Sequence, residues 1–273
     1  MFHLLKLEWL KLRDYTVFRV MGVLYLILLP GFFLSGLSFL PDGDLGGPAG
    51  AIGKNVIYAF PDVFKYLGYG GNWMVFFFLG FIAVISITNE FSNKTLRQNI
   101  ITGMSRTDYF LSKLYFVLAI SAAATIWYFL CGLVIGLFNT ETIYTSAIFR
   151  NIEMVPRYFL MCVGYMSVGV LFGFVIRRTG VALFLYLAYG MFIEPLLRYA
   201  VHLQIVQHKS VHWYPMNAFE DLVPIPFGEM AEGFAQDQGF SFFLSPVLAI
   251  SLSLFYLSLF FFLSWRRMRG ADL

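Results

Sequence analysis

Residues 114–138 read LYFVLAISAAATIWYFLCGLVIGLF, a run of 25 residues without an Asp, Glu, Lys, Arg or His. A helix needs about 20 consecutive apolar residues to cross the roughly 30 Å hydrocarbon core of a bilayer, so this run is long enough to span it. Together with the other long apolar runs it gives six expected spans: Val17–Leu40, Asn72–Thr88, Leu114–Phe138, Tyr158–Ile176, Gly180–Val201 and Ser245–Trp265. The sequence therefore predicts an all-α membrane protein with six transmembrane helices.

The composition of the whole chain supports this fold class. Its 273 residues are 59% hydrophobic and only 13% charged, against about 25% charged in ordinary soluble domains. A soluble fold of this length could not bury so much apolar surface. Cys131 and Cys162 both fall inside expected spans, which excludes a disulfide scaffold. The first apolar run is longer than the roughly 7–15 apolar residues of a signal peptide, so we expect an uncleaved span.

The distribution of basic residues predicts the orientation of the spans, because Lys and Arg collect on the cytoplasmic side. With the N-terminus inside, 13 of the 19 basic residues fall on inner segments: Lys6, Lys11, Arg13, Arg19, Lys94, Arg97, Arg106, Lys113, Arg177, Arg178, Arg266, Arg267 and Arg269. Most of the acidic residues fall on outer segments. Both termini are therefore expected in the cytoplasm, and the basic clusters reflect topology rather than binding to nucleic acid.

Residues 1–15 are expected to form a helix on the inner membrane surface. Phe2, Leu5, Trp9 and Leu12 recur at spacings of three, four and three, which places them on one helical stripe. The rest of the helix mixes Lys, Glu, Arg and Leu, a pattern typical of interfacial helices. Two interpretations stay open: a membrane anchor alone, or an anchor whose mixed face also holds a partner protein.

The inner loop at residues 89–113 predicts a short helix between two spans. Asn93 is a candidate cap for its start and Gly103 for its end, with residues 95–102 between them. Ser105 stands three residues before Asp108, a capping-box spacing, so the third span's helix is expected to begin at Arg106. Two turns are too short to be stable alone. Contacts elsewhere must hold this helix, and a partner surface is a natural source of them.

Two features mark the outer side. The segment 204–244 is punctuated by Pro215, Pro224 and Pro226 yet is apolar between them, which favours short helices lying on or dipping into the outer leaflet. In the fifth span, Glu194 and Arg198 stand at i and i+4, and charge near hydrocarbon is costly unless it is paired or hydrated. The favoured interpretation is a self-neutralising structural pair, and the alternative is a place on a substrate path.

Motifs that would indicate an enzyme or a bound cofactor fail on inspection. The sequence GPAGAIGKN at residues 47–55 resembles a phosphate-binding loop, but Pro48 stands where that motif needs its first Gly and Asn55 where it needs Ser or Thr. The three histidines at 202, 208 and 212 suit an interfacial position as well as a metal site. The sequence contains no HExxH or GxSxG motif. We expect no catalytic residue, metal or cofactor on this chain, which leaves an intramembrane enzyme as a weak alternative.

The inner loop carries a resemblance to a known family. The sequence EFSNKTLR at residues 90–97, followed by TGMSR at 102–106 and by Lys113, resembles the cytoplasmic loop of ABC-2 type transporter permeases. The N-terminal stretch LLKLEWLKLR at residues 4–13, the six spans and the long last outer segment are similar as well. The sequence departs from the family at Lys94, where Gly often precedes Thr-Leu.

The resemblance implies a permease subunit of an ATP-driven exporter in the plasma membrane, which in bacteria is the inner membrane. It implies a dimer, formed with a second copy or with another permease, that binds ATPase subunits carrying the ATP and Mg²⁺. Residues 93–103 would form the coupling helix, and 204–244 would form re-entrant helices. The residues expected to contact the ATPase are Glu90, Thr95, Leu96, Arg97, Ile100, Ile101, Ser105 and Arg106, with Leu96 and Ile100 as apolar anchors.

The sequence does not identify the cargo, although the many aromatic residues of the chain favour a lipid, a hydrophobic drug or a peptide. A non-transporting membrane anchor of an envelope machine is the alternative function. Copurification distinguishes the two functions, because a transporter binds an ATPase and an anchor binds partners without dependence on nucleotide.

Overall fold

In the part of the chain that the structure describes, six helices are long and apolar enough to cross a membrane, which confirms the expected all-α membrane fold. The computed structural model describes residues 2–36, 54–142, 144–206, 208–226 and 243–270, and within these ranges the regular structure is entirely helical. The candidate spans cover Thr16–Ser35, Val63–Ser92, Arg106–Asn139, Thr145–Ile176, Thr179–Ile205 and Pro246–Arg269.

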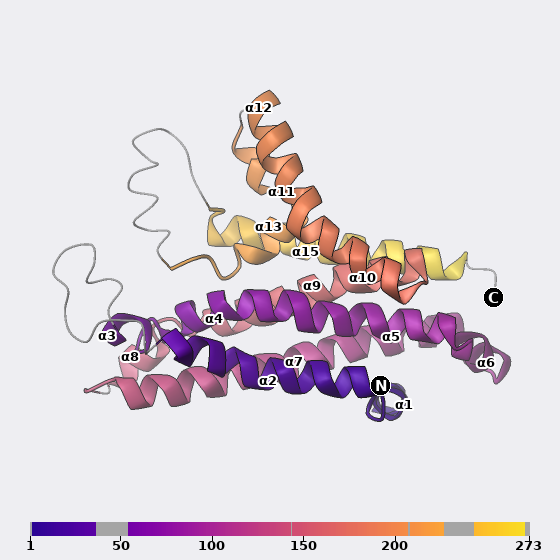
Figure 1. Ribbon diagram of the computed structural model, residues 1–273, viewed down its shortest axis with the longest axis horizontal. Coiled ribbons are helices and arrows are strands. Elements are labelled where there is room, and N and C mark those ends of the chain that lie inside the picture. The colour runs from indigo at the N-terminus through magenta and orange to yellow at the C-terminus, as the bar shows by residue number, and fades with distance from the viewer. Residues whose placement is uncertain (1, 37–53, 143, 207, 227–242, 271–273) are drawn as a thin grey trace.

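The spans correspond to labelled helices as follows (Figure 1). The first span is α2 (Thr16–Ser35), and the second joins α4 (Val63–Met74), η3 (Val75–Leu79) and α5 (Gly80–Ser92). The third span is α7 (Arg106–Asn139), and the fourth joins α8 (Thr145–Phe149) to α9 (Met154–Ile176). The sixth span is α15 (Pro246–Arg269), and the fifth, which is irregular, is described below. The second span begins at Val63 rather than at Asn72 as expected. The glycines and tyrosines at 66–71 weaken the hydropathy signal there, but Leu67, Gly68 and Gly71 are buried in the bundle and continue the helix.

The second and fourth spans form the centre of the bundle. In each of these two spans, 67% of the apolar 18-residue stretch is buried, against 11% in the first span and 17% in the fifth. The fourth span packs on α5, α7 and α15. At its contact with the second span, a Cβ added to Gly169 would lie 2.7 Å from the carbonyl oxygen of Gly80. Small residues at such crossings let two membrane helices approach closely.

The fifth span has an irregular backbone and separates from the bundle along its second half (Figure 1). It runs through α10 (Thr179–Ala188), η4 (Tyr189–Ile193), α11 (Glu194–Leu196), η5 (Leu197–His202) and α12 (Leu203–Ile205), and both η4 and η5 are π-helical. Pro195 has no backbone N–H and its ring obstructs the preceding turn, so a regular α-helix cannot continue through it. Wider π-helical turns on both sides of Pro195 accommodate that interruption.

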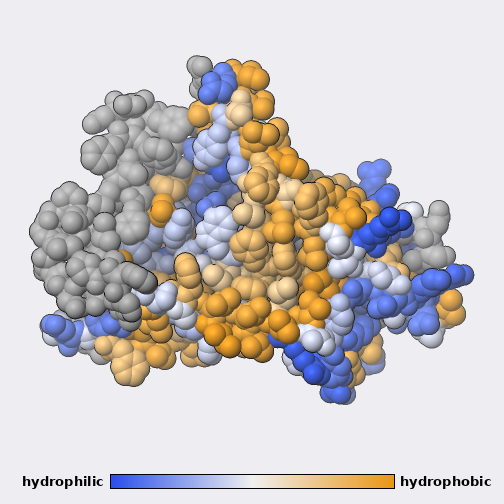
Figure 2. Space-filling view, viewed as in Figure 1, coloured by the Kyte–Doolittle hydropathy of each residue, from blue (hydrophilic) through white to orange (hydrophobic). Residues whose placement is uncertain are grey.

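The two ends of the bundle differ in composition from its middle. The N-terminal helix α1 (Phe2–Leu12), the short helix α6 (Thr95–Ile101) and the end of α15 gather at one end, while α3 (Lys54–Ile57) and α8 lie at the other (Figure 1). Figure 2 shows a broad hydrophobic band between these polar ends. A bilayer would cover such a band.

The segment that follows the fifth span folds back onto the bundle. Its helix η6 (Lys209–His212) leads to α13 (Pro215–Glu220), which packs against α9 and α15. Phe219 is fully buried there, and a Cβ on Gly164 would lie 2.5 Å from its ring. Residues 227–242, which make up a large part of the expected re-entrant segment, lie outside the described residues.

Candidate functional site

The loop between the second and third spans contains a two-turn helix, α6, whose start differs from the expected one. Asn93 does not cap α6; its backbone N–H donates to the Asn89 carbonyl at 2.9 Å and completes α5. Lys94 makes the turn instead, in the left-handed conformation with φ of 57°. Reversing the chain within two residues requires such a conformation, which glycine adopts at lower cost than any residue with a Cβ.

The end of α6 follows the sequence expectation. Gly103 has φ of 103°, its N–H donates to the Ile100 carbonyl at 3.1 Å, and the Met104 N–H donates to the Asn99 carbonyl at 3.0 Å. These two bonds form a Schellman motif, which satisfies carbonyl groups that the helix leaves free. Two residues later, the Ser105 hydroxyl accepts from the Asp108 N–H at 3.0 Å, and α7 begins at Arg106 as the capping spacing predicts.

The apolar residues of α6 face different surroundings from those expected. Leu96 is 2% exposed and belongs to the hydrophobic core of the chain, and Ile100 packs against that core. Ile101, by contrast, is 74% exposed. Leu96 therefore packs within the chain rather than against a partner, which corrects the expectation for that residue. Ile100 packs against the same core but keeps part of its surface exposed, so its place at a partner contact stays a prediction, and Ile101 is the most exposed apolar side chain of α6.

A buried ionic network lies next to α6 and joins three helices. The Lys113 ammonium of α7 contacts a carboxylate oxygen of Glu8 in α1 and one of Glu90 in α5, both at 2.5 Å. Lys11 contacts the same two acids at 3.0 and 3.2 Å. The Ser112 hydroxyl donates to Glu8 at 3.0 Å, and Lys113 also donates to the Ser86 carbonyl at 3.1 Å. Two acids and two bases are thus brought together.

Electrostatics explains why these charges tolerate burial. Burial alone would raise the pKa of Glu8, but the neighbouring ammonium groups of Lys113 and Lys11 lower it below its ordinary value. Glu8 is fully buried, and Glu90 is 6% exposed. Glu90 is consequently part of an internal network rather than a fully solvated charge.

The N-terminal helix uses its mixed face to bind the bundle. Glu8 and Lys11 point toward α5 and α7, where they enter the network, so this face contributes directly to the attachment of α1. On the expected apolar stripe, Leu12 is buried while Trp9 is 51% exposed. Trp9 meets Phe18 of α2 edge to face, with ring centroids 6.1 Å apart. The helix is therefore attached to the protein by its charges and by Leu12, and it leaves half of Trp9 exposed.

Glu194 and Arg198, the charged residues of the fifth span, are buried but do not form the expected ion pair. The Glu194 carboxylate accepts the backbone N–H groups of Met216 and Asn217 at 3.1 and 2.9 Å. The Arg198 guanidinium donates to the Val211 carbonyl at 3.2 Å. The π-helical turns change the i, i+4 geometry, and each charge instead fastens the fifth span to the segment that folds back over the bundle.

The comparison with family models connects these features to known proteins. The model of the ABC-2 family of transporter proteins matches residues 4–193, which include α1, α6, the ionic network and most of the fifth span. The chain belongs to the ABC-2 transporter family. It is accordingly a multi-pass permease, the membrane component of an ABC transporter rather than a catalytic subunit. A comparison with curated proteins found no match.

Around α13 and the start of α15, the permease holds a second group of buried polar residues. Asp221 accepts the Asn217 side-chain amide at 2.9 Å and the Leu244 N–H at 3.1 Å, which joins the end of α13 to the start of α15. Burial raises the pKa of Asp221 to about 7. The three histidines are not gathered on a common point: His202 and His208 both contact Ser210, whereas His212 contacts Arg198.

The sequence interpretation missed the network of the permease because it did not connect the members of the network to one another. Lys113 was part of the family motif and Glu90 was expected at the ATPase contact, but neither Glu8 nor Lys11 was linked to them. The signal available in the sequence was that Glu8 stands among basic residues in a helix expected at the membrane surface. Glu90 and Lys113 lie 82 and 105 positions after Glu8 along the chain, so only the tertiary fold brings these residues together.

Proposed function

We propose that the permease exports a hydrophobic cargo, powered by a separate ATPase subunit that docks on α6. The observation that carries this proposal is the division of α6 between two environments. Leu96 holds the helix to the bundle, whereas Ile101, Arg97 and Gln98 are exposed at the end of the molecule. A helix fixed on one side and open on the other is suited to transmit the motion of a partner.

A polar cleft of about 360 Å³ beside α6 supports the same docking position. It is lined by residues of α1, α5 and α6, among them Lys11, Asn89 and Gln98. Glu90 and Asn99 also line it, and each has a buried polar atom without a hydrogen-bond partner, Oε2 of Glu90 and Nδ2 of Asn99. Unsatisfied buried polar atoms are costly, and a polar side chain of the ATPase entering this cleft would satisfy them.

In this mechanism the ionic network carries movement into the membrane. Lys113 belongs to the third span, Glu90 to the second and Glu8 to the N-terminal helix, so displacement of α6 acts on all three together. ATP and Mg²⁺ bind on the partner, and nucleotide-dependent closure of that partner shifts the permease between inward- and outward-facing states. The α6 end then lies in the cytoplasm, with both termini of the chain, and the membrane is the plasma membrane.

The proposed complex also contains a second permease chain, either identical or related. The first and fifth spans are the least buried of the six, and the fifth exposes large apolar side chains along its length. These include Phe184, Phe192, Leu196 and Tyr199. We expect the second chain to cover part of this surface and lipid to cover the rest. A path for cargo between two such chains would be apolar, which fits a lipid, a hydrophobic drug or a peptide.

Substitution of Ile101 tests the docking. Ile101→Asp leaves the bundle intact, because the side chain is exposed, but places a charge in the centre of the proposed interface. A truncated apolar anchor in an interface core costs about 2 kcal/mol or more, so the substituted permease should lose most of its ATPase copurification and transport-coupled ATP hydrolysis. Tyr144→Asp is the matched control, because Tyr144 is 67% exposed at the opposite end of the bundle.

Leu96→Asp completes the comparison, since it should reduce the yield of folded permease rather than its docking alone. Normal ATPase binding and coupled hydrolysis by Ile101→Asp would contradict the proposal. If partners copurify equally with and without nucleotide and no hydrolysis is stimulated, the alternative of a non-transporting anchor would be supported instead.

A further inference from the structure

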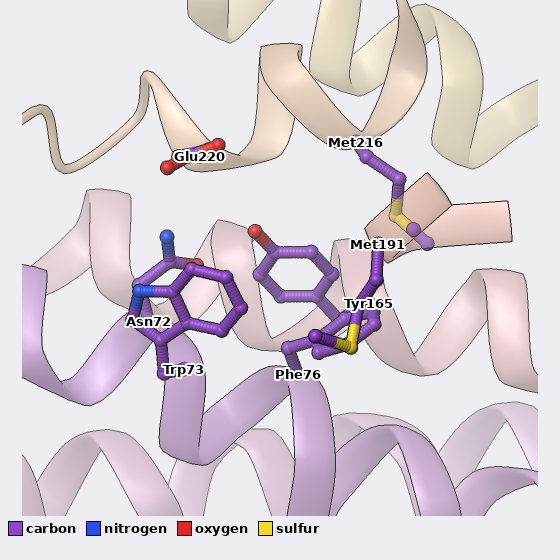
Figure 3. Close-up of a pocket in the computed structure, with 8 residues that line it drawn as sticks. Asn72, Trp73, Phe76, Tyr165, Met191, Met216 and Glu220 are labelled. Atoms are coloured by element: carbon purple, nitrogen blue, oxygen red, sulfur yellow. The ribbon is translucent and has the colours of Figure 1, made fainter. Parts of the chain in front are cut away.

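A small cavity lies where the second, fourth and fifth spans meet α13 (Figure 3). It encloses about 50 Å³ of free volume. Since one water needs about 10–15 Å³ of such space, the cavity is large enough for several waters or for one compact polar group. It is separate from the α6 end, and none of the contacts described above accounts for it.

Two π-helical segments meet at this cavity. Phe76 belongs to η3 in the second span, and Gly190 and Met191 belong to η4 in the fifth. A Cβ on Gly190 would lie 2.6 Å from the Phe76 ring, so only glycine allows the two segments to approach this closely. π-Helical turns are rare and occur frequently at functional sites.

Two hydrogen-bond acceptors of the cavity, on Asn72 and Glu220, have no donor among the described residues. Asn72 is 3% exposed, and its Oδ1 has no hydrogen-bond partner. The Glu220 carboxylate faces the cavity from α13, and no ion pair or hydrogen bond joins it to another described residue. The nearby guanidinium of Arg198 bonds Val211 and His212 instead. Burial raises the pKa of Glu220, as expected for a carboxylate without a cation in contact.

The remaining walls of the cavity are aromatic rings and thioethers. Trp73, Phe76 and Tyr165 surround the space, and Met191 and Met216 close it on the side away from Glu220 (Figure 3). The faces of aromatic rings attract cations, and tryptophan does so most strongly. The same walls disfavour a divalent metal ion, since Ca²⁺ takes six to eight oxygen ligands and Mg²⁺ is octahedral.

We propose that this cavity binds a primary ammonium group carried on an apolar body. The ammonium N–H groups would donate to Glu220 and to Asn72 Oδ1, and the attached carbon chain would lie among the rings and the methionines. A quaternary ammonium would lack the donors that these two acceptors require. If the ligand is the exported cargo, the proposal rests on the export function and narrows the cargo to amphipathic amines. The binding of such an amine to the cavity does not itself depend on the export function.

Binding to the purified permease without its ATPase tests the site. Butylammonium chloride is titrated calorimetrically at constant ionic strength, with butan-1-ol as the neutral analogue of equal length. The native chain should bind butylammonium at least about tenfold more tightly than butan-1-ol, since hydrogen bonds that involve a charged group are stronger than those between neutral groups. Glu220→Gln should lose at least that factor for butylammonium and change little for butan-1-ol.

Two further variants separate the site from general effects. Trp73→Leu should also weaken butylammonium binding, whereas Glu141→Gln, which removes an exposed acid elsewhere, should have no effect. Equal affinities for the two probes, or native affinity in Glu220→Gln, would overturn the proposal. The binding assay contains no ATPase, so a negative result in it does not affect the proposal that an ATPase docks on α6. Conversely, normal docking of Ile101→Asp would not affect the proposal that the cavity binds an ammonium group.

Discussion

At the scale of single residues, Lys113 is the position on which most of the buried charge depends. Its side chain is 1% exposed and its ammonium contacts two carboxylates, so it compensates two acids that have little access to water. Removing one member of a buried ionic network leaves an uncompensated charge, which costs more than the network contributes as a whole. The side chain therefore determines whether α1 stays attached to the bundle.

Replacement of Lys113 by methionine is expected to destabilise the permease by about 3–5 kcal/mol, the cost typical of breaking a buried pair. Adding Glu8→Gln should recover a large part of this loss, because Glu90 and Lys11 then remain as a neutral pair. Melting temperatures of the two variants and of Glu8→Gln alone, measured in detergent, provide the comparison. Independent effects of the two substitutions would show that Lys113 and Glu8 do not interact as the structure indicates.

Asp221 makes the stability of the permease depend on pH. Its pKa rises from an ordinary 3.8 to about 7 in the folded protein, so between these values the folded state binds more protons than the unfolded state. Stability should therefore be greatest at the acidic end of this range and fall as pH rises toward 7. Glu220, whose pKa is also raised by burial, contributes in the same direction.

The measurement is the melting temperature of the purified permease from pH 5 to pH 8. The native protein should lose stability across this range, and Asp221→Asn should show a shallower decline because the amide does not titrate. A decline of unchanged slope in Asp221→Asn would mean that other groups account for the pH dependence.

At the scale of elements, the fifth span illustrates how a helix interruption redirects charged side chains. Pro195 separates two π-helical stretches, and the residues on either side of it bond to the segment at 211–217 rather than to one another. Glu194 and Arg198 thus attach α13 and η6 to the fifth span. The ion pair that the i, i+4 spacing predicted would have left α13 and η6 without that attachment.

This arrangement predicts the outcome of a double substitution. Glu194→Gln leaves one backbone N–H poorly satisfied and should cost about 1–3 kcal/mol. Adding Arg198→Met should not restore the loss, because the guanidinium bonds Val211 and not Glu194. Stability of the single and double variants is compared by thermal unfolding. Recovery of most of the loss in the double variant would favour the self-neutralising pair.

At the scale of the whole molecule, orientation in the membrane can be tested by cysteine labelling. The native Cys131 and Cys162 are both buried, so they should give little background. A cysteine at the exposed position Glu141 should react with an impermeant thiol reagent in intact cells, whereas one at the exposed position Gln98 should react only after the membrane is opened. The reason is that basic residues hold the α6 loop inside. Labelling at position 98 from outside would reverse the proposed orientation.

Hydropathy and local capping signals determined much of the permease without any tertiary information. Six apolar runs are sufficient to specify six spans, because crossing a bilayer requires length and apolarity and little else. The Ser105 cap and Gly103 were likewise predictable, since both interactions close within a few residues of sequence. The family resemblance rested on the same local stretch, and the family match includes it.

Tertiary structure alone decided which residues face the interior and which remain available to a partner. Leu96 and Ile101 look equivalent as apolar residues of one short helix, but the bundle covers the first and exposes the second. Glu8, Glu90 and Lys113 come from three separate helices, and Glu194 finds its partners 22 and 23 residues away. A buried charge is stabilised by whichever groups the fold brings within hydrogen-bond distance, and spacing along one helix does not determine that choice.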